Sequence, residues 1–487
     1  MADPLSAISF AVRGAVVLKY LSQLLFILAI LNLVPLTVAI FFEEYQVAQR
    51  YLIIIGVCLA GSLPYRWIPK PKNLQENEAM TIIALAFIVS PFLATISFTG
   101  SGIPFSDALF EAVSAVTTTG LSTLPDPQQY PKTFQFARSW MQWYGGLGIV
   151  IFSLAFLMGH HSTARKFVES LGGENLITTA QTYARQIFFI YTCITLIAVL
   201  AIVASSGDLL FSVIHGFSAV STGGFSNLGG SLMDVEGWAP RLVVTLGCLV
   251  GALPLVVYYQ MVRGDWQRLK NNYEILVFLI SCTLFCVYLA YAIHTTFAVS
   301  WQDAVFHGIA MGVSAQSTAG FTTINIDTLA DFPKMVMMLA MFIGGSVGST
   351  SGGAKILHII IFFRLLQIAF QKATLPAHAV WEYKLQRQVL SEADIIKVLM
   401  LIIAFVFVIF ISWGVFLWYG YPPVNALFEV ISATMTVGLS VGITHAELEA
   451  PLKWLLCLNM WLGRVEIFAM LILLYPRNWI GRKAAIP

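Results

Sequence analysis

The stretch SAVTTTGLS at residues 114–122 occurs four times in this chain in related forms. The other copies are SAVSTGGFS at 218–226, SAQSTAGFT at 314–322 and SATMTVGLS at 432–440. All four fit the pattern S-A-x-x-T-x-G, followed by Leu or Phe and then by Ser or Thr. The glycines of the four copies are separated by 104, 96 and 118 residues. Matched copies at such intervals indicate a fourfold internal repeat.

The composition is that of a membrane protein. Of the 487 residues, 58% are hydrophobic and only 11% are charged, and the mean hydropathy is +0.80. This composition excludes a disordered chain and a coiled coil, and the net charge of +2 leaves no basic surface for nucleic acid. Ten apolar stretches are long enough to span a hydrocarbon layer of about 30 Å. They lie near 15–42, 51–67, 79–98, 135–158, 184–206, 239–262, 274–296, 333–370, 393–418 and 454–475.

Each copy of the repeat ends a shorter apolar stretch that lies between two of these spans. The shorter stretches run near 105–119, 208–223, 301–319 and 423–437. They are short for full crossings, so we expect re-entrant segments, in which a short helix stops inside the membrane and an extended strand returns. Non-helical backbone at that depth is tolerated only where it lines a wet cavity or is buried in protein.

The return strands are predicted to form a filter for a monovalent cation. Glycine adopts positive φ, which allows carbonyl groups to turn toward a common axis. A ring of carbonyl groups from four copies can replace the hydration shell of the ion. The alternative is that the small residues only allow close helix packing. The predicted filter residues are Thr118, Thr119, Gly120, Thr222, Gly223, Gly224, Thr318, Ala319, Gly320, Thr436, Val437 and Gly438. The carbonyl groups predicted to ligate the ion are those of Thr118, Thr119, Thr222, Gly223, Thr318, Ala319, Thr436 and Val437.

The eighth apolar stretch is interrupted by residues 344–353, of which nine of ten are Gly, Ser or Thr. Such a run cannot hold a straight helix, and it falls just inside the predicted filter, where a polar loop would obstruct a pore. The predicted gate residues are Gly345, Ser346, Gly348, Ser349, Thr350, Gly352, Gly353, Lys355 and Arg464. Lys355 is expected to donate to carbonyl groups that the loop leaves free. Residues 344–348 also match G-x-S-x-G, the nucleophile elbow of hydrolases, but that elbow requires a strand-to-helix turn and a histidine partner.

Ionisable residues inside the apolar stretches are candidate functional groups. Arg464 lies ten residues into the last span, and it is interpreted either as a barrier and tether in the permeation path or as half of a structural ion pair. Glu466 is favoured as structural. Glu111 and Glu429 stand nine residues before their repeat glycines, and two roles remain open for them: attracting cations to an outer vestibule or capping the short helices. The eight histidines show no metal-ligand spacing.

The basic residues predict the orientation. With the N-terminus inside, six of the 27 Lys and Arg residues fall in outer loops and two within the membrane, which leaves 19 on the inner side. This positive-inside bias predicts cytoplasmic N- and C-termini and re-entrant segments that enter from outside. The chain has no Walker A motif, so energy input or metabolic sensing would come from a gradient or another chain.

Four units with one filter glycine each resemble the Trk/Ktr/HKT superfamily of potassium transporters. The resemblance is closest to the TrkH type, the membrane subunit of bacterial Trk systems, because two extra spans precede the first unit. The stretches that carry it are WYGGLGI at 143–149, the loop at 344–353 and LGRVE at 462–466. The resemblance implies potassium-selective uptake across the bacterial inner membrane, gated by the loop and by Arg464. Glycine at all four filter positions favours potassium over sodium.

The resemblance also implies partners. These are membrane lipid, a second copy of the chain and a peripheral cytoplasmic nucleotide-binding subunit of the TrkA type, with no nucleic acid. Neither a cofactor on this chain nor an enzymatic activity is expected, and potassium is the transported ion. The alternatives are a carrier of a small solute coupled to an H⁺ or Na⁺ gradient and, more distantly, an intramembrane hydrolase. A carrier usually shows inverted repeats with paired broken helices, whereas these repeats are parallel and only one broken helix is predicted.

The predicted fold class is therefore an all-α polytopic membrane protein. Four pseudo-symmetric helix–pore-loop–helix units surround one central pore, and two further helices precede them. The predicted units are an N-terminal two-helix domain at 1–72 and pore units at 73–165, 166–270, 271–375 and 376–487, the third with the broken helix.

Overall fold

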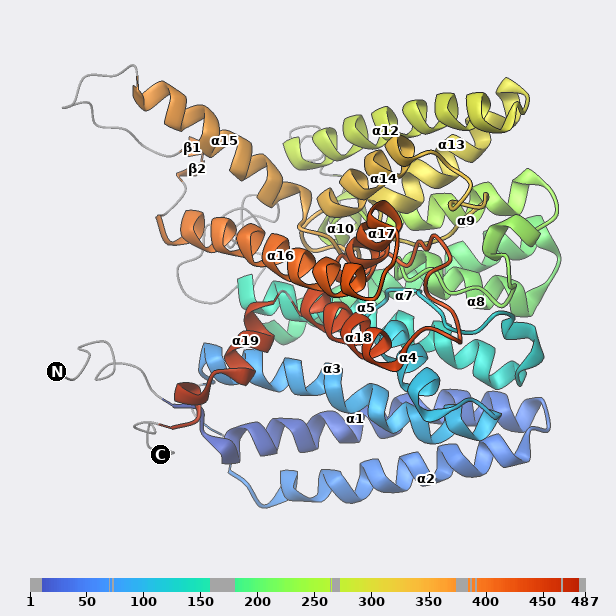
Figure 1. Cartoon of the computed structure of the whole chain (residues 1–487). Helices are drawn as coiled ribbons and strands as arrows, with labels where there is room; N and C mark the ends of the chain where they lie inside the picture. Colours follow the sequence, from blue (N-terminus) through green and yellow to red (C-terminus); the bar gives the residue numbers. More distant parts are fainter. Residues whose placement is uncertain are drawn as a thin grey trace.

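The computed structural model is a polytopic membrane protein of the all-α class, with one short pair of strands (Figure 1). It describes residues 11–69, 71, 74–157, 180–262, 264, 272–373, 384–385, 388–389, 392–465 and 467–480. Six helices in this part of the chain are long and apolar enough to cross a membrane, and two bent helix pairs bring the number to eight. The predicted fold class is confirmed. The predicted unit boundaries at 72/73, 165/166, 270/271 and 375/376 lie outside the described residues.

Two helices, α1 (Gly14–Phe41) and α2 (Tyr45–Ser62), pack as a hairpin ahead of the repeats. Each repeat then consists of a first helix, a short helix and a last helix. The first helices are α3 (Glu76–Phe98), α7 (Ala180–Ser206), α12 (Tyr273–Phe297) and α16 (Glu392–Trp418). The short helices are α4 (Phe105–Val116), α8 (Leu209–Val220), α13 (Trp301–Gln316) and α17 (Pro423–Thr434). The last helices are α5 (Lys132–Leu157), α9 (Trp238–Gly251) with α10 (Leu255–Val262), α14 (Asp331–Ile343) with α15 (Ile356–Ala373), and α18 (Ala450–Arg464) with α19 (Phe468–Leu474).

Minor elements complete the description. The strands β1 (Lys384–Leu385) and β2 (Gln388–Val389) pair antiparallel between α15 and α16. Short 3₁₀ turns occupy Leu63–Arg66, Thr99–Ser101, Pro127–Gln129, Ser231–Asp234 and Pro476–Asn478.

The short helices have the lengths that re-entrant segments require. They contain 12, 12, 16 and 12 residues, and 12 residues at 1.5 Å per residue give about 18 Å, well below the hydrocarbon thickness. Local signals fix where two of them begin: the side chain of Asp208 accepts from Phe211 N at the start of α8, and that of Ser300 accepts from Asp303 N at the start of α13. All four end at the repeat motif.

Three of the last helices are broken, where the sequence predicted a single interruption between α14 and α15. In the second unit, α9 and α10 meet at 93°, and in the fourth, α18 and α19 meet at 114°. The prediction of one broken helix was therefore wrong. In the second unit the reason is Pro254, which lacks an N–H and ends the regular hydrogen-bond ladder. The carbonyl groups of Gly251 and Ala252 then accept hydrogen bonds from residues 350 and 346 of the third unit.

The units pack in a closed ring, in which the last helix of one unit contacts the short helix of the next. These contacts pair α5 with α8, α9 with α13, α14 with α17, and α18 with α4. Polar bonds join three of these pairs. Trp238 Nε1 donates to Asp303 Oδ1 at 3.3 Å, Lys334 Nζ to Asn425 Oδ1 at 3.0 Å, and Lys453 Nζ to Asp107 Oδ1 at 2.6 Å. The chain thus returns to its first unit after the fourth.

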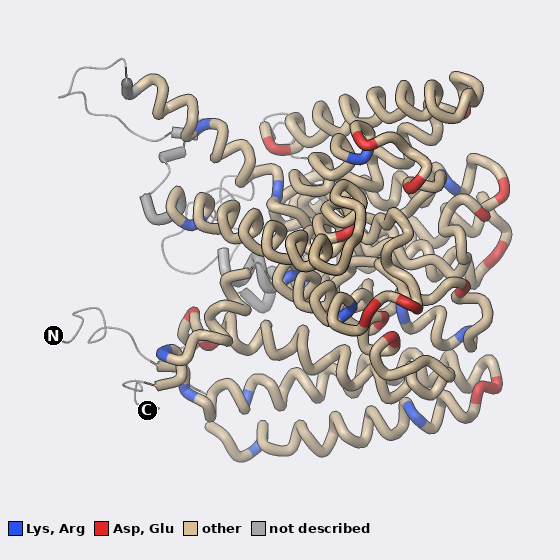
Figure 2. Tube along the Cα trace, in the orientation of Figure 1, with Lys and Arg blue, Asp and Glu red and all other residues tan. Residues whose placement is uncertain are grey.

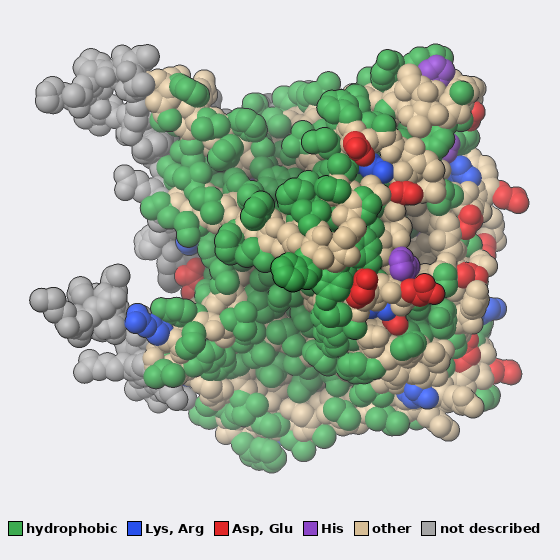
Figure 3. All heavy atoms as spheres, in the orientation of Figure 1, with side chains coloured by type: hydrophobic (Ala, Val, Ile, Leu, Met, Phe, Trp, Pro, Cys, Tyr) green, Lys and Arg blue, Asp and Glu red, His purple; other side chains and the backbone are tan. Residues whose placement is uncertain are grey.

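The surface matches a membrane-embedded body. A broad apolar belt covers the middle of the molecule in Figure 3, and charged side chains concentrate toward two opposite ends in Figure 2. The first and last described segments meet at one end, where Val12 N donates to the Asn478 carbonyl at 2.8 Å. Both segments therefore lie on the same side, and the cytoplasmic orientation of that side remains a prediction.

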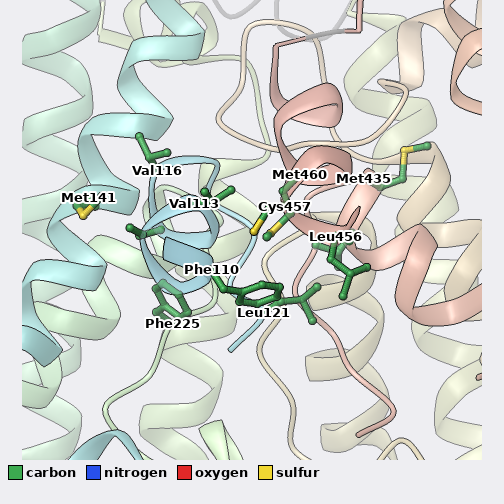
Figure 4. Packing of buried hydrophobic residues seen from close by; sticks show 14 of the residues in the cluster. Phe110, Val113, Val116, Leu121, Met141, Phe225, Met435, Leu456, Cys457 and Met460 are labelled. Atoms are coloured by element: carbon green, nitrogen blue, oxygen red, sulfur yellow. The ribbon is translucent and has the colours of Figure 1, made fainter. Parts of the chain in front are cut away.

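The buried core is built around the short helices. In Figure 4, Phe110 and Val113 of α4 lie beside Cys457 and Met460 of α18. Met141 of α5 approaches α4 from its other side. The apolar packing of the first short helix thus draws on the last helices of units one and four.

The outer ion pair between units four and one is expected to stabilise the ring. Lys453 and Asp107 are only 5% and 6% exposed, so Lys453→Met would leave a buried carboxylate without its partner, at a cost of about 3–5 kcal/mol. The exposed pair Lys397–Glu76 has an N–O distance of 4.0 Å, and Lys397→Met should cost less than about 1 kcal/mol. Thermal unfolding midpoints in detergent measure both. Equal midpoints for the two variants would contradict a bracing role for Lys453.

Candidate functional site

The four return segments, residues 117–122, 221–226, 317–322 and 435–440, leave their short helices through the same turn. In each, the N–H of the residue before the repeat glycine donates to the carbonyl of the motif serine, five residues earlier, at 2.7–2.9 Å. The intervening threonine adopts positive φ, which a β-branched residue rarely does. These threonines are Thr118, Thr222, Thr318 and Thr436, with φ of 52°, 52°, 58° and 50°. Such strain is tolerated only where the surroundings determine the backbone.

The repeat glycines contact one another's segments in a closed cycle. A Cβ added to Gly120 would lie 2.2 Å from the carbonyl oxygen of Gly223, and one added to Gly224 would lie 2.2 Å from that of Ala319. A Cβ on Gly320 would lie 2.2 Å from the Val437 oxygen, and one on Gly438 would lie 2.0 Å from the Thr119 oxygen. The cycle passes through all four units and closes on itself. Glycine is required here by this close approach as well as by its φ of 78–92°.

The structure therefore brings the twelve predicted filter residues together. Four segments from four units meet edge to edge, and the carbonyl groups of residues 119, 223, 319 and 437 occupy equivalent places in the cycle. All the threonines at the turn are fully buried. An arrangement of this kind can present several carbonyl oxygens to one desolvated monovalent cation.

One position in each short helix holds the return segment in place. The residue nine positions before each repeat glycine contacts the hydroxyl two positions after it. Glu111 accepts from Ser122 Oγ at 2.7 Å, His215 bonds to Ser226 Oγ at 3.0 Å, Met311 accepts from Thr322 Oγ1 at 3.7 Å, and Glu429 accepts from Ser440 Oγ at 2.8 Å. This explains why Ser or Thr ends every copy of the motif.

The contacts of Glu111 and Glu429 favour neither of the two predicted roles. Both side chains are fully buried, and neither caps a helix. Glu111 also accepts from Thr123 N at 2.9 Å and pairs with Arg138 at 3.0 Å. Glu429 accepts from the backbone of Val441 and Thr444. Both carboxylates brace the chain that follows the repeat glycine.

The predicted gate loop is buried directly against three of the return segments. Thr350 Oγ1 accepts from Thr222 Oγ1 of the second return segment at 3.5 Å. It also lies 2.9 Å from the carbonyl oxygens of Val220 and Gly251 in unit two, to which its one hydrogen is directed. Gly352 N donates to Thr318 Oγ1 of unit three at 2.6 Å, and Gly353 N to the Met435 carbonyl of unit four at 3.0 Å. The loop is thus held by the segments that it is predicted to close.

The remaining gate residues bind the loop to itself and to the broken α9–α10 pair. Gly345 N donates to Ser351 Oγ at 2.8 Å, and Ser349 Oγ to the Ser346 carbonyl at 2.6 Å. Ser346 N donates to the Ala252 carbonyl, and the Gly348 carbonyl accepts from Leu255 N, both at 3.1 Å. Lys355 Nζ donates to the Ser351 carbonyl, the kind of contact that the sequence predicted.

Arg464 joins the gate loop to the first unit. Its guanidinium is buried, at 3% exposure for the residue. Nη1 donates to the Thr350 carbonyl at 2.9 Å, and Nη2 to the Gly145 carbonyl at 3.3 Å. No carboxylate in the described part of the chain lies within 4.0 Å of the guanidinium nitrogens; Glu466 lies outside the described residues. The contacts are those of a tether to the loop.

Sequence reasoning missed a second row of glycines. Three of these glycines lie against a carbonyl oxygen near the end of a short helix. An added Cβ would lie 2.1 Å from the Val116 oxygen at Gly145, 2.4 Å from the Val220 oxygen at Gly251, and 1.8 Å from the Thr434 oxygen at Gly463. Together with Gly344 they stand 24 to 27 residues after their repeat glycines. That regular spacing was a signal in the sequence. The residue after each of them is Gly146, Ala252, Gly345 or Arg464, so the arginine stands where the other units have a small residue.

The comparisons with known proteins agree with this architecture. The sequence profile of the TrkH family, described as cation transport proteins, matches residues 44–304 and 274–479. The chain belongs to the TrkH family of cation transport proteins. The resemblance stated from the sequence is thereby confirmed.

TrkH family members from several organisms align with nearly the whole chain. The chain is 25% identical to the Trk system potassium uptake protein TrkH of Escherichia coli, over 88% of this chain and 91% of that protein. It is 29% identical to the Trk system potassium uptake protein TrkI of Halomonas elongata, over 98% of this chain and 100% of that protein. The crystal structure of the potassium transporter TrkH from Vibrio parahaemolyticus matches with a TM-score of 0.86 at 23% identity, over 96% of this chain and 100% of that chain.

The TrkH family is a transporter family, and the local structure argues against the hydrolase alternative. Ser346 of the G-x-S-x-G match lies between helices α14 and α15. A nucleophile elbow requires a strand before the serine, and a helix stands there.

Two glycines with the same φ separate strain from close approach. Gly102 and Gly120 both have φ of +87°, but a Cβ on Gly102 has nothing within 4 Å. Gly102→Ala should lower the unfolding free energy by about 1–2 kcal/mol through φ strain alone. Gly120→Ala should cost about 1–3 kcal/mol more through overpacking against Gly223. Unfolding midpoints in detergent compare them, and equal losses would argue against the closed glycine cycle.

Proposed function

We propose that this chain takes up potassium through the ring formed by the four return segments. The observation that carries the proposal is the closed cycle in which each repeat glycine approaches the carbonyl of the next unit. Carbonyl groups of residues 118, 119, 222, 223, 318, 319, 436 and 437 would replace the hydration shell of K⁺. Smaller ions would be rejected because the ring replaces their tighter hydration shells less well. The relatives named potassium uptake proteins support the choice of ion.

The gate in this proposal consists of the loop at 344–353 and Arg464. The loop is bonded to three return segments through Thr222, Thr318 and Met435. Arg464 is bonded to the loop through the Thr350 carbonyl. A guanidinium stays charged at any accessible pH. At a dielectric constant of about 20 and a separation of about 5 Å it repels a cation by about 3 kcal/mol. That barrier would slow permeation by about two orders of magnitude until the loop and Arg464 move apart.

The proposed setting is the bacterial inner membrane with cytoplasmic termini. The apolar belt would face lipid, and the end that carries both described termini would face the cytoplasm. The relatives belong to systems named Trk, which supports a peripheral nucleotide-binding subunit of the TrkA type. A homodimer is also proposed.

A gradient-coupled carrier is the second candidate, because three of the four last helices are broken. Discontinuous helices are typical of secondary transporters. The cyclic order of the contacts, however, supports parallel repeats around one axis. Liposomes with a K⁺ gradient but no H⁺ or Na⁺ gradient separate the two: passive K⁺ flux supports the filter, and flux that appears only with a second gradient supports the carrier.

Growth of a potassium-uptake-deficient bacterium tests the function directly. Cells that carry this gene, with its own regulatory partner where one exists, should grow at potassium concentrations that do not support the vector control. Uptake of labelled potassium should be inhibited by unlabelled K⁺ far more than by Na⁺. Growth equal to that of the vector control, despite normal protein levels in the membrane, would falsify the proposal.

Releasing the gate should raise the basal flux. Arg464→Ala removes both the charge and the bond to the Thr350 carbonyl, and we expect about tenfold to hundredfold faster K⁺ flux in liposomes with unchanged preference for K⁺ over Na⁺. Arg464→Lys keeps the charge and serves as the control, with flux close to wild type. Thr350→Val removes the hydroxyl bonds to unit two and should also raise flux, by less. Normal yield with reduced flux in Arg464→Ala would show that the arginine supports the path instead of closing it.

A further inference from the structure

Gln142 of α5 lies against the return segment of the second unit. The side chain is fully buried. Its Nε2 donates to the Gly223 carbonyl at 2.5 Å, and its Oε1 accepts from Phe225 N at 3.3 Å and from Ser218 Oγ at 2.7 Å. Residues 223 and 225 flank the repeat glycine Gly224, so one carboxamide of unit one spans the central turn of unit two.

The same side chain accounts for a departure within the repeat. The residue before the repeat glycine is Thr119, Ala319 or Val437 in three units, but Gly223 in the second. A Cβ on Gly223 would lie 2.4 Å from Cδ of Gln142. Gly223 has no positive φ, so backbone conformation does not require glycine there. The space taken by the Gln142 carboxamide does.

The hydrogen bond makes one carbonyl of the cycle different from the other three. Gly223 O accepts from Gln142, whereas the carbonyl oxygens of Thr119, Ala319 and Val437 accept no hydrogen bond from any described residue. An N–H donor shares the negative charge of a carbonyl oxygen and restricts its movement. The ring is therefore chemically asymmetric at this level.

The other units lack this donor. The residue three positions before the second-row glycine is Gln142 in unit one, but Cys248, Met341 or Met460 in the others. Cys248 and Ala319 belong to one buried apolar cluster, so the contact between units two and three at this level is apolar. Unit one alone has an amide there.

We propose that Gln142 is a positioning residue that tunes the filter through the Gly223 carbonyl. This role rests on the proposed potassium filter. The donated N–H keeps the Gly223 oxygen from moving inward around an ion smaller than K⁺, and it lowers the field strength of that oxygen. Both effects disfavour Na⁺. Gly223 and Gln142 form a matched pair, in which glycine makes room for the carboxamide and the carboxamide replaces the missing side-chain packing.

The selectivity test uses Gln142→Met, which keeps the side-chain length and matches units three and four. K⁺ uptake should continue, but its preference over Na⁺ should fall about fivefold to tenfold, the effect of one hydrogen bond. The matched control is Gln135→Met on the same helix, since Gln135 donates to the Tyr130 carbonyl away from the return segments. A K⁺/Na⁺ preference in Gln142→Met equal to that of Gln135→Met would overturn the proposal.

A second test does not depend on transport. Gly223→Ala should lower the unfolding midpoint in detergent, because the new Cβ meets the carboxamide of Gln142. Adding Gln142→Ser should restore much of the loss, and adding Gln135→Ser should not. Rescue by Gln142→Ser supports the matched pair, and a lack of rescue overturns the matched pair. If Gln142→Met does not assemble, the rescue experiment decides the proposal by itself. If wild type moves no K⁺ yet the rescue is seen, the proposed function fails while the pairing of Gln142 with Gly223 stands.

Discussion

The close approach of each repeat glycine to a carbonyl oxygen of the next unit is the constraint on which the rest of the structure depends. A single added carbon atom would lie 2.0–2.2 Å from that oxygen at all four positions. The short helices must end just before this level, and the threonine two residues after each helix end takes positive φ to turn the chain. Three glycines of the second row, Gly145, Gly251 and Gly463, let their last helices lie against the carbonyl ends of those same short helices. Close packing of backbone on backbone thus propagates outward from the ring.

The four units share this frame but differ in the residue that follows the second-row glycine. After the second-row glycine stand Gly146, Ala252, Gly345 and Arg464. The third unit extends into the loop at 344–353, whose amides and hydroxyls bond to carbonyl and hydroxyl groups of units two, three and four. The fourth contributes the arginine that bonds to the loop and to Gly145 of unit one. The loop and Arg464 therefore each occur in one unit only, because each unit contributes a different side chain at an equivalent place.

Buried polar groups in this protein act mainly between segments that are distant in the sequence. Lys453 pairs with Asp107, and Gln142 spans Gly224, while Glu111 and Glu429 hold the strands that follow their own short helices. Each such group is expensive to bury without partners, so each fixes one relative placement of two elements. Apolar packing alone would leave the units freer to slide, since lipid solvates apolar helix faces as well as protein does.

The sequence by itself determined the class of the protein, its four units and its ring. Hydropathy shows the spans because a bilayer requires long apolar helices, and the motif shows the turn because glycine at a positive φ and Ser or Thr after it are local requirements. The loop at 344–353 was visible for the same reason, since a Gly, Ser and Thr run cannot form a helix. Tertiary structure alone decided which residues these groups contact. Glu111 and Glu429 brace return segments. The last helix of unit two is broken into α9 and α10 where it meets the loop at 344–353, and Gly223 is glycine because the Gln142 carboxamide lies beside it. These contacts join residues that lie from 11 to 99 positions apart in the chain. A contact between two different units leaves no periodic pattern in a single sequence.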